Sequence, residues 1–442
     1  MKSSLPKVLH PVAGSPMISR VVNQARLAGA KEVRVVLGYG EALVRQVIEP
    51  LGAICFKQNE QRGTADAVRS ARPENLEGPV LILNGDHPLV EVADIKRVCE
   101  DFFSAPKGIS LVTATLKNPG SFGRIVRQDG DVKAIVEAKD ASGDTLKIRE
   151  INTGIYMLDA KLLNDFLPKI SNENAQGEFY LTDIIRLAIE HRIAISPVNL
   201  GKHVAVGVNS QIDLARASKK AYMIKAEKLM AEGVVMIDPS TNYIDEQVSI
   251  GASTVIYPGV FIRGATRIGS FCVIEPNVFI NTAVIEDSVH VLLGSHLEGC
   301  AIRSKASVGP YARIRPDTDI GVDAKVGNFV ELKKVKFGAG AKASHLTYLG
   351  DAEIGENTNI GCGTITCNYA IDHKKYKTKI GKNVFVGSDT QFVAPVEIGD
   401  GAIIGSGSTI TKNVPANALA VARGRQIIKE NFAAQKVPTK KE

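Results

Sequence analysis

One aliphatic residue recurs at every sixth position through much of the second half of the chain. A period of six matches no face of an α-helix, which has 3.6 residues per turn. It is typical of hexapeptide repeats, in which each repeat forms one short strand of a parallel β-helix and the repeated side chain points inward. Three unbroken runs have this spacing: Ile250, Ile256, Ile262, Ile268, Ile274 and Ile280; Ile302, Val308, Ile314, Ile320, Val326 and Leu332; and Ile380, Val386, Phe392, Ile398, Ile404 and Ile410.

An antiparallel β-sandwich is the alternative to a β-helix, because six is also a multiple of the two-residue period of a strand. Sandwich strands seldom keep one residue type at a fixed six-residue interval over several strands. Glycine also follows the repeated residue at several places, such as Gly269, Gly309 and Gly327, where it relieves a tight corner. The pattern therefore favours a β-helix, which needs capping and favours self-association.

The first half of the chain instead alternates helices with strands. We expect a helix at residues 16–30, buried parallel strands at 32–38 and 79–83, and further strands at 108–116 and 151–158. This alternation is typical of a doubly wound α/β domain, which binds ligands at the carboxyl ends of its strands. A helix capped by Asn209 or Ser210 is expected next. We therefore predict an α/β domain at 1–208, a linker helix at 209–233 and a β-helix domain with a C-terminal tail at 234–442.

The composition is that of an ordinary soluble protein, with 44% hydrophobic and 23% charged residues among 442. No apolar run approaches the length of a membrane-spanning helix, and the N-terminus has no signal-peptide core, so the cytoplasm is the expected compartment. The net charge of +7 fits anionic small-molecule substrates, and no nucleic-acid-binding motif accompanies it. The six cysteines lack the spacing of zinc ligands and are expected to be reduced thiols.

Several polar residues of the first half lie at expected strand ends or helix starts. Lys7 precedes a helix start, where it either meets a phosphate or is an ordinary surface lysine. Asp86 follows a buried strand, where it either binds Mg²⁺ or caps a turn. The remaining candidates, which fit recognition of a base edge or of sugar hydroxyls, are Gln58, Gly63, Thr64, Glu137 and Asn152.

The second half has its own candidates, several of them where the repeat is disturbed between Phe337 and Lys379. His345 lies there, and a histidine titrates in the range that fits removal of a proton from an amine, although a structural role is the alternative. Cationic candidates for a phosphate, which are otherwise solvated, are Arg315, Lys333 and Lys375. Candidate donors to a developing oxyanion are Asn368, Tyr369 and Ser388.

Together these motifs resemble one bacterial family. The segments LPKVLHPVAGSPM, QRGTADA, LNGDHPL, FGRIV, EINTGIY and GEFYLTD cover the first half, and RIRPDTDIGVDAKVGNFVELKK, SHLTYLGDAEIGENTNIGCGTITCNY and VFVGSDTQFVAPV cover the second. The chain is similar over nearly its whole length to the bifunctional N-acetylglucosamine-1-phosphate uridyltransferase / glucosamine-1-phosphate N-acetyltransferase family. The resemblance implies a Rossmann-like, mostly parallel α/β domain, a left-handed β-helix, and a homotrimer with acetyltransferase sites between subunits.

The resemblance also implies two reactions. Acetyl-CoA would acetylate glucosamine-1-phosphate, and the product would react with UTP and Mg²⁺ to give UDP-N-acetylglucosamine and pyrophosphate. The positions matching the nucleotide and sugar site are Lys7, Gln58, Gly63, Thr64, Gly123, Glu137, Asn152 and Asn209, with Asp86 and Asn209 as metal ligands. The amino-sugar phosphate site matches Arg315, Lys333, Tyr348, Asn359 and Lys375. His345 matches the general base, and acetyl-CoA contacts match Cys362, Asn368, Tyr369, Ser388, Ser406 and Arg423.

The sequence departs from the family pattern at three places. The family's first strand and its L-A-A-G-x-G-T-R-M loop are not found, so uridyltransferase activity is expected to be weak in the chain as given. Cys362 replaces a small alanine, and Ala370-Ile371 replaces Asp-Gly in a loop that is one residue longer. Two other functions remain open: another sugar-1-phosphate nucleotidyltransferase with a β-helix tail, and a trimeric scaffold without activity.

Overall fold

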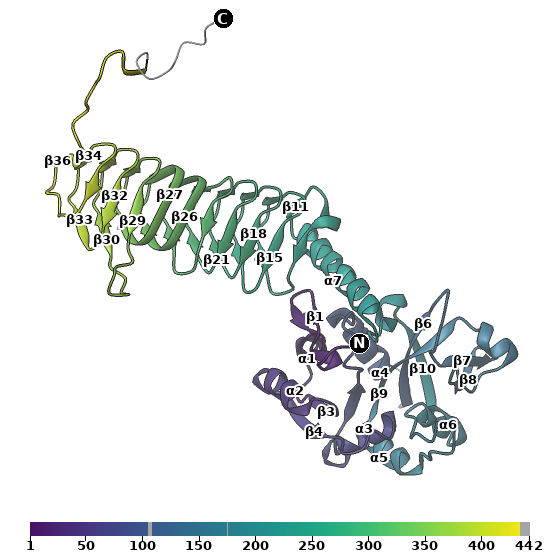
Figure 1. Cartoon of the computed structure of the whole chain (residues 1–442). Coiled ribbons are helices and arrows are strands. Elements are labelled where there is room, and N and C mark those ends of the chain that lie inside the picture. The colour runs from purple at the N-terminus through teal and green to yellow at the C-terminus, as the bar shows by residue number, and fades with distance from the viewer. Residues whose placement is uncertain (105–107, 175, 434–442) are drawn as a thin grey trace, which may run out of the picture. The chain divides into compact units, whose positions relative to one another are not determined.

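The computed structural model describes residues 1–104, 108–174 and 176–433, so the end of the predicted tail lies outside the described residues. The chain forms two compact units, Met1–Tyr222 and Met223–Glu442. The division falls within α7 (Gln211–Ala231), the helix expected between the two halves (Figure 1). Within the described ranges, no helix is both long and apolar enough to cross a membrane.

Unit 1 is built on a six-stranded sheet in the order β10-β6-β9-β7-β8, with β5 also paired to β9. β10 (Ala194–Asn199) is parallel to β6 (Gly108–Thr115). Both β6 and β5 (Pro79–Ile82) are antiparallel to β9 (Glu150–Asp159), so β5, β6 and β10 point in one direction. The carboxyl ends of these three strands therefore share one edge of the sheet, and this edge is where an α/β domain places its ligands.

Two further strand pairs complete unit 1. β7 (Arg124–Gln128) and β8 (Asp131–Val136) form an antiparallel hairpin. β3 (Arg34–Leu37) and β4 (Ile54–Lys57) form a separate parallel pair. The prediction of a buried parallel strand at 79–83 is wrong in two respects, because β5 is antiparallel to β9 and its side chains are only half-buried. Among the described residues only one strand, β9, pairs with β5, so the other edge of β5 has no paired strand.

The helices of unit 1 cover the sheets. The predicted helix at 16–30 is observed as the shorter α1, which follows Pro16. It buries the predicted Ile18, Val21, Val22 and Ala25, and it also buries polar residues such as Arg20 and Gln24. Gly29, at a φ of +106°, ends it, because few other residues adopt this backbone conformation. The remaining elements are β1 (Pro11–Val12), β2 (Ser15–Pro16), α1 (Met17–Leu27), α2 (Glu41–Ile48), α3 (Thr64–Ser70), α4 (Val92–Ser104), α5 (Ala160–Phe166) and α6 (Asp183–Glu190).

Unit 2 is the predicted parallel β-helix (Figure 1). Every third strand pairs in parallel with the next, so each coil has three sides. Two long strands, β26 (Lys325–Phe337) and β27 (Lys342–Ile354), each run around all three sides.

We name the three sides by their strands. Face A contains β11 (Val235–Met236), β14 (Val255–Ile256), β17 (Val273–Ile274), β20 (His290–Val291), β23 (Ser307–Val308), β28 (Asn359–Ile360), β31 (Phe385–Val386), β34 (Ile403–Ile404) and β36 (Leu419–Ala420). Face B contains β12 (Tyr243–Ile244), β15 (Phe261–Arg263), β18 (Phe279–Asn281), β21 (His296–Glu298), β24 (Arg313–Ile314), β29 (Ile365–Cys367), β32 (Gln391–Val393) and β35 (Thr409–Ile410). Face C contains β13 (Ser249–Ile250), β16 (Arg267–Ile268), β19 (Val284–Ile285), β22 (Ala301–Ile302), β25 (Asp319–Ile320), β30 (Thr378–Ile380) and β33 (Val396–Ile398).

The six-residue repeat fills the interior of the coil as predicted. All residues of the three runs are buried, and they form one continuous core. The prediction of a disturbance from Phe337 to Lys379 is too broad, because β27 keeps the regular coil and Thr364 and Thr366 take inward positions with their hydroxyls bonded to backbone carbonyls. The irregular part is the loop 368–377, between β29 and β30.

Candidate functional sites

Three of the predicted nucleotide-site residues meet at the carboxyl end of β5. The Lys7 ammonium Nζ lies 2.6 Å from Asp86 Oδ2 and 2.9 Å from Asn209 Oδ1. Backbone bonds hold these segments together, since Val208 N donates to the Asp86 carbonyl at 3.0 Å. The Asp213 carboxylate accepts from Asn209 N and Ser210 N at the start of α7.

These residues fit a magnesium ion. Asp86 Oδ2 and Asn209 Oδ1 already converge on one cation, the Lys7 ammonium, and both are the hard oxygen donors that Mg²⁺ prefers. Within the described residues, no group of three or more His, Cys, Asp or Glu side chains forms a closed metal cage. An open pair of oxygens matches the usual Mg²⁺ site, in which one or two protein ligands act together with substrate phosphates.

A second group of predicted residues lies around the N-terminus of α3. Gln58 Nε2 donates to Asp66 Oδ2 at 3.0 Å and to the Gly63 carbonyl at 3.3 Å. Gly63 has a φ of +120°, and a Cβ there would collide with the backbone of Phe179, so only glycine fits. Thr64 Oγ1 accepts from Leu181 N at 2.9 Å. The segment 179–181 therefore fixes the conformation of this loop.

A third group combines Gly123, Glu137 and Asn152. Asn152 N donates to the Gly123 carbonyl at 2.9 Å, and Gly123 lies against the Glu137 carboxylate. Burial raises the pKa of Glu137, while a hydrogen bond from Thr182 opposes this effect. Asn152 Nδ2 donates to the Tyr156 hydroxyl at 2.8 Å, which orients the amide. These carboxylate, amide and backbone groups can bind hydroxyls of a sugar.

Two residues that we did not predict connect these groups. Asn84 Nδ2 donates to the Thr153 carbonyl at 3.0 Å and so ties the Asp86 loop to β9. Arg124 is buried, and its guanidinium donates to the carbonyls of Gly120 and Phe122, which positions Gly123. The motifs LNGDHPL and FGRIV contain both residues, but a buried supporting role leaves no spacing signal in a single sequence.

In unit 2, one set of predicted residues forms a column along the corner between faces A and B. The register pairs Asn328 with His345, and the pairings of β27, β28, β31 and β34 continue this order through the following coils. The order along the corner, hereafter the corner column, is Asn328, His345, Cys362, Ser388 and Ser406. His345 and Cys362 are exposed, and Arg423 Nη1 donates to the Ser406 carbonyl at 2.8 Å. The predicted base thus lies in one line with three of the predicted acetyl-CoA contacts, Cys362, Ser388 and Ser406.

The predicted phosphate-binding cations gather along the next corner, between faces B and C. Arg315 and Lys333 occupy equivalent positions in consecutive coils. Lys375 reaches Lys333 from the loop 368–377, and the pKa of Lys333 is lowered first by this neighbour and then by Arg315. Arg315 also pairs with Glu331 Oε1 at 2.9 Å. The remaining repulsion among the three cations would be relieved by an anion bound between them. We name Arg315, Lys333 and Lys375 the cation cluster.

Other predicted residues surround the cation cluster. Tyr348 and Asn368 both lie over Gly350, where a Cβ would meet the Tyr348 hydroxyl and the Asn368 amide. Asn368 Nδ2 donates to Asp351 Oδ2 at 2.6 Å. The Tyr369 hydroxyl and His373 Nδ1 are 2.8 Å apart in the loop. Asn359 is on face A, separate from this group. Over the described part of the chain, no hydrogen bond or ion pair joins the cation cluster to the corner column.

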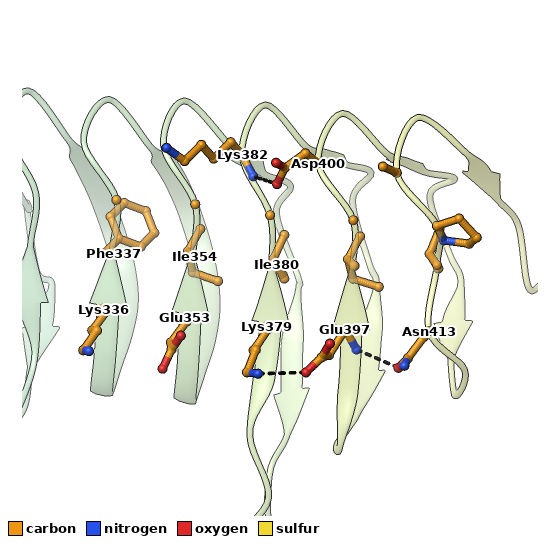
Figure 2. A pocket seen from close by; sticks show the side chains of 18 of the residues that line it. Lys336, Phe337, Glu353, Ile354, Lys379, Ile380, Lys382, Glu397, Asp400 and Asn413 are labelled. Carbon is orange, nitrogen blue, oxygen red and sulfur yellow. Dashed lines mark hydrogen bonds and ion pairs between the residues drawn. The ribbon is translucent and has the colours of Figure 1, made fainter.

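A groove of about 740 Å³ lies on face C and contains no predicted site residue (Figure 2). Its outward side chains alternate in charge from coil to coil, and Lys379 Nζ donates to Glu397 Oε1 at 2.8 Å. Lys382 N donates to Asp400 Oδ1 at 2.7 Å. The charges of Lys379 and Glu397 therefore compensate each other within the groove.

These features define a nucleotidyltransferase domain followed by a hexapeptide-repeat transferase domain. Residues 1–127 match the MobA-like NTP transferase domain family, and residues 377–412 match the bacterial transferase hexapeptide family (six repeats). The chain is 62% identical to the bifunctional protein GlmU of Bdellovibrio bacteriovorus over 99% of this chain and 96% of that one. It is 44% identical to the bifunctional GlmU proteins of Trichlorobacter lovleyi and Geotalea uraniireducens, with the same two coverages.

The chain therefore belongs to the family of bifunctional GlmU proteins. The prediction of this family, and of a bifunctional transferase with an α/β domain and a hexapeptide β-helix, is confirmed. These matches extend over both units. The alternative of another sugar-1-phosphate nucleotidyltransferase with a β-helix tail is therefore not needed to explain the chain.

Proposed function

We propose that this protein carries out both transfers that its family resemblance implies, with weak uridylyl transfer in the chain as given, because the family's L-A-A-G-x-G-T-R-M loop is not found in it. The β-helix acetylates glucosamine-1-phosphate with acetyl-CoA, and the α/β unit joins N-acetylglucosamine-1-phosphate to UTP. The observation that carries this proposal is the arrangement of His345, Cys362, Ser388 and Ser406 in one column, beside an independent cation cluster on the next corner.

In the acetyl transfer, the sugar amine attacks the thioester carbonyl, a C–N bond forms, and the C–S bond to coenzyme A breaks. His345 accepts the proton that the amine loses. Arg315, Lys333 and Lys375 bind the sugar phosphate, and Tyr348 lies near the sugar ring. Asn359, which is on face A, would contact the sugar from another copy of the chain. Ser388, Ser406 and Arg423 contact acetyl-CoA along the corner column, next to Cys362, and Asn368 and Tyr369 donate near the reacting carbonyl.

In the uridylyl transfer, a phosphate oxygen of the sugar attacks the α-phosphorus of UTP, and pyrophosphate leaves. Gln58, Gly63 and Thr64 bind the nucleotide, and Gly123, Glu137 and Asn152 bind the sugar. Lys7 neutralises negative charge on the phosphates. Asp86 and Asn209 hold Mg²⁺, which supplies further charge neutralisation when bound.

We also propose that the protein is a homotrimer of the β-helix unit. An apolar ridge supports this proposal: Tyr311, Phe329 and Leu346 follow one another beside the corner column and are 50%, 58% and 61% exposed. The rings of Tyr311 and Phe329 stack at 5.8 Å. In such a trimer, we propose that the cation cluster of one copy and the His345 of another form one acetyltransferase site, because the described residues of a single copy show no hydrogen bond or ion pair between the two groups.

The remaining assignments are proposals of the same kind. The functional boundaries are 1–208 for uridylyl transfer, 209–233 for the linker helix and 234–442 for acetyl transfer. The protein acts in the cytoplasm on small molecules and binds neither nucleic acid nor membranes.

The test is His345→Ala, assayed for both reactions. Release of the coenzyme A thiol should fall by roughly 10²–10⁴-fold, the usual contribution of a positioned general base. Pyrophosphate release by the α/β unit should stay at the wild-type level, because His345 belongs to the other unit. A His345→Ala protein with full acetyltransferase activity at every pH would refute the assignment of the base.

A further inference from the structure

Asn328 is the first residue of the corner column, and neither reaction yet has a role for it. Its Oδ1 lies 3.2 Å from His345 Nδ1. The two residues are register partners on β26 and β27, so they lie one directly above the other in consecutive coils.

The partner atom of Asn328 decides which nitrogen of His345 bears the proton. An amide oxygen accepts hydrogen bonds and cannot donate them. A hydrogen bond between Oδ1 and Nδ1 therefore requires a proton on Nδ1. In the neutral imidazole, the lone pair is then on Nε2, and Nε2 is the nitrogen that accepts a proton.

The backbone next to Asn328 fixes this contact. A Cβ at Gly327 would collide with the carbonyl of Ser344, so the two coils approach closely only because residue 327 is glycine. Thr347 Oγ1 donates to the His345 carbonyl at 2.7 Å and holds the corner from the other side. Both backbones are thus held at the point where the two side chains meet.

We propose that Asn328 is a positioning residue for acetyl transfer, which keeps His345 in the Nδ1–H tautomer and directs Nε2 towards the amine. The proposal rests on the function proposed above for His345. It adds Asn328, which contacts His345 from the preceding coil, whereas Cys362 lies on the following coil.

Nuclear magnetic resonance of the full-length protein labelled with ¹⁵N-histidine tests the tautomer directly. The His345 signals are assigned by their loss in His345→Gln. At about pH 8.5, where a histidine is ordinarily neutral, His345 should show a protonated Nδ1 and an unprotonated Nε2. A predominant Nε2–H form in the wild type would overturn the proposal. This result does not depend on activity, so it separates failure of this proposal from failure of the proposed function.

Two substitutions at Asn328 give the kinetic test. Asn328→Leu is similar in size but has no acceptor, so kcat should fall about tenfold or more, part of the contribution of the base, with little change in either KM. Asn328→Asp keeps an acceptor and adds a negative charge beside the imidazole. Asn328→Asp should retain the tautomer and most of the activity. It should also move the acid limb of the plot of kcat against pH to higher pH, because a carboxylate stabilises the imidazolium.

The matched control is Asn281→Leu, at an outward position on β18 of face B. It should keep the wild-type kcat, pH profile and His345 tautomer. Thermal unfolding of all three variants identifies any loss of folding. A purely structural role for Asn328 would lower stability and activity together and leave the pH profile in place. That outcome, or a wild-type kcat in Asn328→Leu, would refute the proposal.

Discussion

Lys7 and Asp86 are 79 positions apart in the sequence, yet the Lys7 ammonium lies 2.6 Å from the Asp86 carboxylate. Asn209, at the start of the connecting helix, reaches the same ammonium. The fold thus brings together one cation and two oxygen donors from three separate segments. A phosphate entering here would compete for the lysine and release both oxygens for a metal ion.

Lys7→Met tests this relationship, because methionine keeps much of the side-chain length and removes the charge. Pyrophosphate release should fall by about 10²–10³-fold, the usual effect of losing one preorganised electrostatic donor. Acetyl transfer should not change. Lys31→Met is the control, since Lys31 is an exposed lysine of the same unit. Equal losses in the two variants would show that Lys7 has no special role.

Lys333→Ala should raise the KM for glucosamine-1-phosphate about tenfold or more, with a smaller effect on kcat. A charge-assisted hydrogen bond to phosphate contributes roughly 1.5–3 kcal/mol, and the cation cluster loses one of its three members. Lys336→Ala is the matched control, because Lys336 lies on the same strand, β26, but lines the groove on face C. Steady-state kinetics at low salt measure the KM for glucosamine-1-phosphate in both variants. An unchanged KM in Lys333→Ala would contradict the phosphate assignment.

The stability of unit 1 should depend on pH through His203. Its Nε2 lies 2.9 Å from Asp94 Oδ2, and this hydrogen bond raises the pKa of His203. A raised pKa means that the folded protein binds the proton more tightly than the unfolded chain. The resulting stabilisation is complete below the ordinary histidine pKa of about 6.5 and is lost as pH rises through the higher folded value.

His203→Gln should therefore be less stable than wild type near about pH 6 and close to it near about pH 9. The difference should stay within about 1 kcal/mol, because the pair is partly exposed to solvent. Chemical denaturation at several pH values measures it. If the stability difference between wild type and His203→Gln grew with rising pH, the proposed role of the His203–Asp94 hydrogen bond would be contradicted.

A substitution in the core of the coil should change the free energy of unfolding more than His203→Gln does. Phe337 is 2% exposed, and Phe337→Ala should lower the free energy of unfolding of unit 2 by about 3–5 kcal/mol, through lost burial and the cavity that remains. Phe385 points outward and is 54% exposed, so Phe385→Ala should change it by less than about 0.5 kcal/mol. Denaturation followed by circular dichroism compares the two. Similar losses would mean that outward positions also support the coil.

The sequence predicted the β-helix best, because a buried residue at every sixth position follows directly from the geometry of the coil. Ile256, Ile314 and Ile404 are all fully buried, as that spacing requires. The strand at 79–83 was predicted less well. Its apolar composition indicates burial on both faces, but burial also depends on the neighbouring strand, which local sequence does not specify.

The residues of the candidate sites also differ in how well the sequence predicts them. Residues that follow strands or carry charge, such as Asp86 and Lys333, were predicted from their chemistry and from family motifs, and their roles stay predictions. Asn328 and Arg124 were not found, because their roles depend on contacts with His345 and with the carbonyls of a loop. Such contacts join residues that are separated by a full coil or by a turn, and they have no fixed spacing in the sequence.

The corner column determines how insertions and deletions in the β-helix would alter the distance between His345 and Ser406. Since each coil adds one residue to the column, His345 and Ser406 are three coils apart, or about 14 Å at the usual spacing between strands. Inserting or deleting a complete turn of three hexapeptides between them would lengthen or shorten that reach by one step of about 4.8 Å. The loop 368–377 leaves the step intact, because Asn359 and Phe385 remain neighbours across it. Whole turns thus set the distance between His345 and Ser406 in fixed steps, while a corner loop such as 368–377 changes the local side chains without changing that distance.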